Sequence, residues 1–151
     1  MLVIGRWPAQ LRQASCTLEP HLFVYGTLMS AAEGVRLGQD MRARLQREAA
    51  SLGEATMPGR LYDLGRYPGL VASPDAGDAV HGEVFRLSDP ANAFTWLDAY
   101  ENVRPNDPAS EYERVVRTVR LATGDEIDAW VYVYRGDVAR ARHVTDGRWR
   151  P

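Results

Sequence analysis

The pattern of apolar and polar positions divides the first half of the chain into a strand, a helix and a second strand. Residues 22–25 are apolar and rich in aromatic and β-branched side chains, which predicts a short buried strand. Apolar residues at four-residue spacing predict a helix over about residues 30–50, and Gly34 and Gly38 leave open its division into two pieces. Residues 52–64 predict one long irregular strand, bent at Gly53 and at Pro58-Gly59.

The second half predicts further strands around one helix. Short apolar runs predict strands at residues 70–72 and 80–87, and Asp89-Pro90 marks the start of a helix over residues 91–100. Residues 112–122 and 127–134 predict a hairpin whose second strand is apolar on both faces. Bent strands with two buried faces indicate an α+β domain, a small mixed β-barrel of about six strands with two or three flanking helices. We expect it to occupy residues 21–151, after a loosely ordered N-terminal extension of residues 1–20.

Size and charge narrow the class of protein. At 151 residues with a net charge of -2, the chain is long enough for one domain with a real core. Nothing in its charge pattern indicates a nucleic-acid or membrane partner, and no apolar run approaches the ~18 residues that a membrane span requires. The first 20 residues lack the continuous apolar segment of a secretory signal, so we expect a cytoplasmic protein.

The sequence lacks the residues that several kinds of chemistry require. The single cysteine, Cys16, allows no internal disulfide, and every basic residue is arginine, which excludes Schiff-base chemistry through a chain lysine. The histidines, His21, His81 and His143, lie far apart without metal-ligand spacing. We therefore expect no metal site.

The stretch from residue 21 to residue 30 is the first candidate site. Gly26 ends the predicted strand, and Thr27 and Ser30 are each suitable N-caps for the helix that follows. A strand, a tight turn and a helix start bring unpaired backbone N–H groups together, which makes a cradle for a carboxylate or a phosphate. The alternative is an ordinary strand–turn–helix, which the residues alone favour.

Three acidic residues are candidates for proton transfer. Glu101 ends the second helix, where the helix dipole and partial burial would raise its pKa toward that of a general base. A solvated helix-end glutamate is the favoured alternative on the residues alone. Asp98 is expected to point outward, and Glu83 to be a core acid paired with an arginine such as Arg60 or Arg114. The aromatic residues of the last strand, Trp130, Tyr132 and Tyr134, could line a pocket, although core filling is the default.

Six short motifs in register resemble the gamma-glutamylcyclotransferase-like superfamily, most closely its short bacterial type. The similarity covers about residues 22–149. The motifs are Val24-Tyr25-Gly26-Thr27-Leu28, Gly59-Arg60-Leu61-Tyr62-Asp63-Leu64-Gly65 with Tyr67-Pro68-Gly69, His81-Gly82-Glu83-Val84-Phe85, Leu97-Asp98-Ala99-Tyr100-Glu101, Tyr112-Glu113-Arg114 and Ala129-Trp130-Val131-Tyr132. No single motif is specific, but their common order supports the fold.

The resemblance implies a small barrel with a central cavity and assigns site residues. Tyr25, Gly26, Thr27 and Leu28 would bind the α-carboxylate of a γ-glutamyl group through backbone N–H groups, and Glu101 would be the general acid/base. Because of that match, we favour a catalytic Glu101 over a solvated helix-end glutamate. Tyr112 and a tyrosine of the last strand, Tyr132 or Tyr134, would line the pocket.

The implied reaction closes a γ-glutamyl amide or dipeptide to 5-oxoproline and releases an amine, with neither metal nor cofactor. The partner would be this small molecule. The leaving amine and the oligomeric state are left open. The alternatives are a non-catalytic small-ligand binding or stress-linked interaction module on the same fold, and a dedicated acyl-removing enzyme acting on a larger amine.

Overall fold

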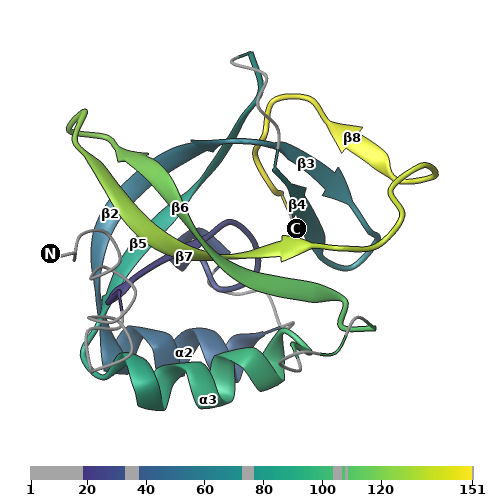
Figure 1. Ribbon diagram of the computed structural model, residues 1–151. Helices are drawn as coiled ribbons and strands as arrows, with labels where there is room; N and C mark the ends of the chain where they lie inside the picture. The colour runs from purple at the N-terminus through teal and green to yellow at the C-terminus, as the bar shows by residue number, and fades with distance from the viewer. Residues whose placement is uncertain (1–18, 33–37, 73–76, 104–106, 108, 151) are drawn as a thin grey trace, which may run out of the picture.

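The computed structural model describes residues 19–32, 38–72, 77–103, 107 and 109–150 (Figure 1). Residues 1–18 of the expected N-terminal extension, Cys16 among them, and Gly34 in the predicted first helix lie outside these described residues.

Five strands form a closed barrel in the order β1 (His21–Val24), β5 (Ala79–Leu87), β2 (Ala49–Pro58), β6 (Tyr112–Leu121) and β7 (Glu126–Tyr134). Strand β1 pairs antiparallel with β5 and parallel with β7, where Leu22 lies opposite Trp130, so this strand closes the ring and makes the sheet mixed. The hairpin of β6 and β7 has the expected boundaries to within one residue. The predicted α+β fold with a mixed barrel is confirmed.

A second, three-stranded sheet lies beside the barrel, in the order β4 (Pro68–Val71), β3 (Arg60–Asp63), β8 (Arg142–Val144) (Figure 1). The long strand predicted over residues 52–64 is in fact two strands, β2 and β3, which divide at Gly59. A Cβ atom at Gly59 would lie 3.1 Å from the carbonyl oxygen of Val71, so the chain is closely packed at this bend. The second expected bend, at Gly53, is a β-bulge in the pairing of β2 with β5.

The helix predicted over residues 30–50 is wrong in its extent. The chain forms a short 3₁₀ helix, η1 (Ser30–Ala32), and an α-helix, α2 (Gln39–Glu48), after which Ala49 already belongs to β2. Gly38 precedes α2 with a φ of 76°, a left-handed conformation that glycine adopts readily. The second helix, α3 (Pro90–Tyr100), begins as expected, because the Asp89 side chain accepts the N–H of Asn92.

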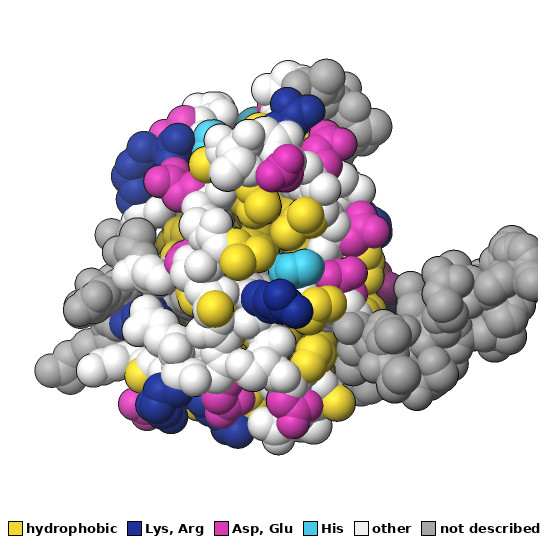
Figure 2. Space-filling model, turned by 90° about the vertical axis from the view of Figure 1, so that its left-hand side faces the viewer, with side chains coloured by type: hydrophobic (Ala, Val, Ile, Leu, Met, Phe, Trp, Pro, Cys, Tyr) yellow, Lys and Arg dark blue, Asp and Glu magenta, His cyan; other side chains and the backbone are white. Residues whose placement is uncertain are grey.

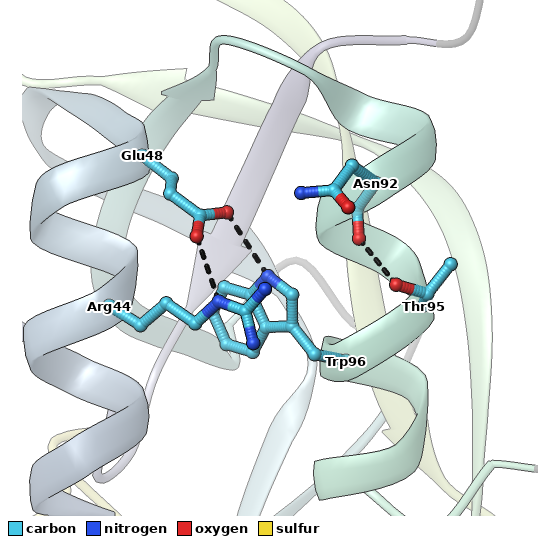
Figure 3. Close-up of polar contacts among 5 residues, drawn as sticks. All are labelled: Arg44, Glu48, Asn92, Thr95 and Trp96. Carbon is cyan, nitrogen blue, oxygen red and sulfur yellow. Dashed lines mark hydrogen bonds and ion pairs between the residues drawn. The ribbon is translucent and has the colours of Figure 1, made fainter.

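Helices α2 and α3 lie side by side on one end of the barrel (Figure 1), and polar contacts join them (Figure 3). Glu48 of α2 accepts Arg44 Nε at 2.8 Å and the indole N–H of Trp96 at 3.2 Å. The Arg44 guanidinium lies over the Trp96 ring, 4.8 Å from its centroid. These contacts fix the orientation of α3, which ends at the cavity described below.

Hydrophobic residues form two packed clusters. One fills the barrel and includes Phe23, Met57 and Val131, and the other lies between the barrel and the helices and includes Leu45 and Leu97. The apolar side chains Phe94, Trp96 and Leu97 of α3 are all buried. These clusters attach both helices to the barrel wall.

The molecular surface mixes both signs of charge around a central group of hydrophobic side chains on the face drawn in Figure 2. Leu52 is the one large hydrophobic side chain classed as exposed in the described part of the chain. Within the same residues, no helix has the length and apolar character needed to cross a membrane.

Candidate active site

A cavity of about 210 Å³ opens where β1 ends, beside the C-terminal end of α3. Its volume is below the ~300–1,000 Å³ typical of sites for drug-sized ligands, which favours a small metabolite. The described residues that line it are Phe23, Val24, Tyr25, Gly26, Thr27, Leu28, Tyr67, Pro68, Tyr100, Glu101, Asn102, Glu111, Tyr112 and Tyr132. All seven site residues predicted from the sequence are among them, and Tyr134 is not.

The turn at residues 26–28 lines the cavity with its backbone N–H groups. Among the described residues no hydrogen bond is recorded from the N–H of Gly26, Thr27 or Leu28, whereas the N–H of Met29 already donates to Gly26 O. Gly26 also touches Pro68, because a Cβ atom there would lie 2.9 Å from the proline Cγ. These N–H groups are available to an anionic ligand.

The expected helical contribution to this cradle is wrong, because η1 has only three residues and a macrodipole requires a longer helix. The expected N-caps are also wrong. Thr27 Oγ1 lies 2.8 Å from the hydroxyl of Tyr100, and Ser30 Oγ donates to Glu83 at 2.8 Å. The cradle therefore depends on the turn itself.

The turn is braced by a buried arginine. Arg42 of α2 is 4% exposed, and its Nη1 donates to the carbonyl oxygen of Thr27 at 2.6 Å. The pairing of Thr27 with Tyr100 also joins the turn to the last residue of α3. The two segments that carry the predicted site are thus held together directly.

No arginine in the described part of the chain pairs with Glu83, contrary to expectation. Its carboxylate accepts the N–H and the hydroxyl of Ser30 and the hydroxyl of Ser51. Arg60 and Arg114, the expected partners, bind Asp78 and Asp98 instead. Glu83 therefore connects η1 to strand β2 and does not line the cavity.

Glu101 directly follows α3 and lines the cavity with partial exposure. Burial raises the pKa of its carboxyl from an ordinary 4.5 to about 8, helped by the nearby charges of Glu111 and Asp98. No arginine or histidine among the described residues forms an ion pair with it. Such a carboxyl can both accept and return a proton near neutral pH.

Asp98 is not outward-pointing, contrary to expectation. It accepts Arg114 Nε at 2.8 Å and Nη2 at 3.2 Å, and it accepts the Tyr132 hydroxyl at 2.7 Å. The Arg114 guanidinium in turn lies over the rings of Phe94 and Trp130, 3.9 and 4.4 Å from their centroids. This cluster fixes the end of α3 against β6 and β7, directly behind the cavity.

The tyrosines of the cavity differ in what their hydroxyls can still do. Tyr25 is fully used, because its hydroxyl donates to Tyr132 O at 2.6 Å and accepts the N–H of Leu70 at 3.2 Å. Tyr112 donates to Pro68 O at 2.8 Å, and Tyr132 donates to Asp98, so both can only accept from a ligand. Burial raises the pKa of all three hydroxyls and keeps them neutral.

Glu111, Tyr67 and Tyr100 line the cavity but were not found from the sequence. The Tyr67 hydroxyl donates to Glu111 Oε2 at 3.1 Å and Oε1 at 3.3 Å. Glu111 lies just before β6, next to the predicted Tyr112, and that neighbour is the only signal that could have identified it. The part of the chain that is described contains no group of three His, Cys, Asp or Glu side chains suited to a metal ion.

The fold and the cavity define a class of protein: a small mixed barrel with a ligand cavity that contains a protonatable carboxyl and a turn of free N–H groups. A sequence profile of the gamma-glutamyl cyclotransferase, AIG2-like family matches residues 22–151. The chain belongs to this family.

Individual relatives are consistent with this family membership. The chain is 34% identical over 130 residues to a Vibrio cholerae protein whose name provisionally assigns it as a gamma-glutamylcyclotransferase, covering 85% of this chain and 93% of the relative. The solution structure of ytfP from Escherichia coli superposes with a TM-score of 0.57 at 29% identity, covering 85% of this chain and 95% of that one.

More distant structures share the fold. An AIG2-like protein from Mus musculus has a TM-score of 0.58 at 23% identity, covering 87% of this chain and 95% of the mouse chain. YkqA from Bacillus subtilis has a TM-score of 0.61 at 21% identity, and the match covers 86% of this chain but 39% of that one.

Proposed function

We propose that this protein is a gamma-glutamylcyclotransferase-type enzyme that converts a γ-glutamyl amide or dipeptide to 5-oxoproline and releases an amine. The observation that carries the proposal is Glu101, a carboxyl with a pKa raised to about 8 and no paired cation among the described residues, in the same cavity as the free N–H groups of residues 26–28. Family membership supports the reaction type.

Each end of the substrate has a complementary group in the cavity. The N–H groups of Gly26, Thr27 and Leu28 suit the α-carboxylate of the γ-glutamyl group. Glu101 suits the α-ammonium, whose proton it must remove before the nitrogen can attack. The hydroxyls of Tyr112 and Tyr132 have free lone pairs for the substrate N–H groups.

The proposed reaction is an intramolecular ring closure. Glu101 takes a proton from the α-ammonium, and the resulting amine attacks the γ-carbonyl carbon to form the new C–N bond. The bond to the leaving nitrogen then breaks as Glu101 returns its proton to that nitrogen. The Glu101 carboxylate then passes the second proton of the ring nitrogen to the released amine, which leaves 5-oxoproline and the amine in its ammonium form. Because attacker and carbonyl belong to one molecule, positioning supplies much of the rate.

Replacing the carboxyl tests the assignment. Glu101→Gln should lower 5-oxoproline release from a panel of γ-glutamyl amines and dipeptides by about 10²–10⁴-fold, measured by chromatography. Glu113→Gln is the matched control, since Glu113 is exposed on β6 and absent from the cavity lining, and it should retain full activity. If the wild-type protein binds these compounds but releases no 5-oxoproline, the protein is a binding module rather than an enzyme.

The pH profile provides a second test of the same group. Because Glu101 must be ionised to accept the proton and its pKa is about 8, kcat/KM should rise with pH through neutrality and level off above about pH 8. A profile that is flat from pH 6 to pH 9 would contradict Glu101 as the base.

A further inference from the structure

Arg42 is a buried cation that lies behind the turn at residues 26–28 and does not itself line the cavity. The residue is 4% exposed, and its Nη1 donates to the carbonyl oxygen of Thr27 at 2.6 Å. A guanidinium group stays protonated throughout the physiological pH range. A full positive charge therefore lies on the far side of the Thr27 carbonyl from the cavity.

Helix α2 brings this charge to the turn through close packing at its start. Gly38 precedes the helix, and a Cβ atom there would lie 3.0 Å from Thr27 Oγ1, so a side chain at this position would crowd the turn. The N–H of Arg42 donates to Gly38 O at 2.8 Å, which places Arg42 one helical turn further along. Backbone packing therefore sets the position from which the guanidinium reaches the turn.

The direction of the peptide group between Thr27 and Leu28 follows from this contact. The C=O and N–H bonds of a trans peptide point in opposite directions. Because the Thr27 carbonyl points to Arg42, the N–H of Leu28 points away from α2, and Leu28 lines the cavity. A donor on the carbonyl also polarises the peptide group, which makes its N–H a stronger donor.

A carboxylate that enters the cavity meets negative rather than positive side chains. Of the described lining residues, Glu101 and Glu111 are acidic and none is basic. Each of these side chains repels an anion when it is ionised. The charge of Arg42 does reach the cavity: burial raises the pKa of the Tyr100 hydroxyl, and Arg42 acts against that rise. Arg42 is thus placed to offset the repulsion from behind the turn.

We propose that Arg42 is the positioning residue for the substrate α-carboxylate: it orients the N–H of Leu28 and supplies, from outside the cavity, the positive charge that favours a carboxylate over a neutral group. This inference rests on the proposed function. The α-carboxylate is the same in the substrate and in the ring-closing transition state, so Arg42 stabilises both. Its loss should therefore raise KM and leave kcat nearly unchanged.

Two matched substrates test the proposal: the γ-glutamyl amide that the wild-type protein converts fastest, and the same compound with a carboxamide in place of its α-carboxylate. In Arg42→Gln the KM of the carboxylate substrate should rise about tenfold or more, the scale of a charge-assisted hydrogen bond, while kcat stays within about threefold. The KM of the carboxamide substrate should change by less than about threefold, because that substrate has no charge to attract.

Three further proteins separate charge from structure. Arg42→Lys keeps the charge, and its KM for the carboxylate substrate should be at least about threefold below that of Arg42→Gln. Arg47→Gln removes an exposed charge from the same helix and should leave both KM values unchanged. Citrulline at position 42 is neutral, nearly isosteric and still able to donate to the Thr27 carbonyl. It should show the same selective rise in KM even if Arg42→Gln does not fold, which circular dichroism and thermal unfolding reveal.

Contrary results are equally specific. An equal rise in KM for both substrates overturns the inference, because Arg42 would then only maintain the shape of the turn. An unchanged KM in a folded, neutral variant overturns it as well. If the wild-type protein converts no γ-glutamyl amide, the proposed function fails. Calorimetry with γ-glutamyl-n-butylamide and its α-carboxamide analogue then decides the inference: the carboxylate must bind more tightly in the wild-type protein and must lose that advantage in Arg42→Gln, and any other result overturns it.

Discussion

Two carboxylates three residues apart, at the end of α3, lie in opposite environments. Asp98 faces β6 and β7, where Arg114 and Tyr132 satisfy it with three hydrogen bonds. Glu101 faces the cavity, where no cation among the described residues pairs with it and where its pKa is raised to about 8. One turn of helix therefore separates a fully partnered acid from an unpartnered one.

The difference shows how the fold holds in place a carboxyl group whose ionised form is destabilised. A partly buried carboxyl without a cationic partner resists ionisation, and it remains in place only if its backbone is fixed by other contacts. The Asp98–Arg114–Tyr132 cluster provides that fixation from behind. We conclude that Asp98 positions α3 while Glu101 is the group available to a ligand.

The largest effect on stability should come from breaking the ion pair between Asp98 and Arg114. Arg114→Met removes the cation and leaves Asp98 without its ion pair, in a site where the two side chains are only 21% and 17% exposed. We expect a loss of about 2–4 kcal/mol in the free energy of unfolding and a Tm lower by roughly 4–12 °C. Denaturant and thermal unfolding measure this. A loss below about 1 kcal/mol would show that the pair does not hold α3.

Replacing the unpaired acid, Glu101, should raise the free energy of unfolding rather than lower it. The folded-state pKa of Glu101 is raised from 4.5 to about 8, so the folded protein binds a proton more tightly than the unfolded chain. Stability associated with this group is complete below pH 4.5 and is lost as the pH rises through 8. The free energy of unfolding of Glu101→Gln relative to wild type should therefore be about 1–3 kcal/mol higher at pH 8.5 than at pH 5, after allowance for solvent access through the cavity.

The control for that prediction is the Glu113→Gln variant, whose stability relative to wild type should not change between the two pH values. Thermal unfolding at pH 5 and pH 8.5 makes the comparison. A Glu101→Gln difference that is the same at both pH values would show that Glu101 ionises normally.

A smaller effect is expected at the contact that joins α3 to the turn. Tyr100→Phe removes the hydrogen bond with Thr27 and should cost about 0.5–1.5 kcal/mol, with a higher KM because the turn loses a support. A double-mutant cycle with Thr27→Val measures the coupling. Additive losses would mean that the two hydroxyls act independently.

The smallest effect should come from a charge pair outside both regions. Arg120 and Glu126 lie on the β6–β7 hairpin, and their side chains are 63% and 57% exposed. Arg120→Gln should change the free energy of unfolding by less than about 0.5 kcal/mol and leave activity unchanged. A larger change would show that an exposed ion pair stabilises this protein as well as a buried one, so that burial would not explain the larger effect expected at Asp98 and Arg114.

Much of the fold could be predicted because the relevant signals are local. The hairpin of β6 and β7, the Asp89-Pro90 start of α3 and the bend near Gly59 depend on neighbouring residues. Strand β8 was missed because three residues show no usable period. The end of α2 was misplaced because Ala49 suits either structure, and its pairing with Leu87 decides the outcome.

The site was predictable only in part, for a related reason. The turn at Gly26 and Glu101 belong to recognisable motifs, but the partners of Asp98 and Glu83 come from other strands and helices. Apart from its neighbour Tyr112, Glu111 carries no signal, since nothing in the sequence shows that Tyr67, 44 residues away, lies beside it.

The short first strand has a consequence for how the chain folds. Its parallel pairing with β7 joins Leu22 to Trp130, and Tyr25 bonds to a residue 107 positions further along. Contacts so distant in sequence carry a large loop-closure entropy, so they form after the local hairpins. The cavity includes the end of β1, and it is therefore completed only with ring closure. During refolding, ligand binding should appear after β-structure has formed.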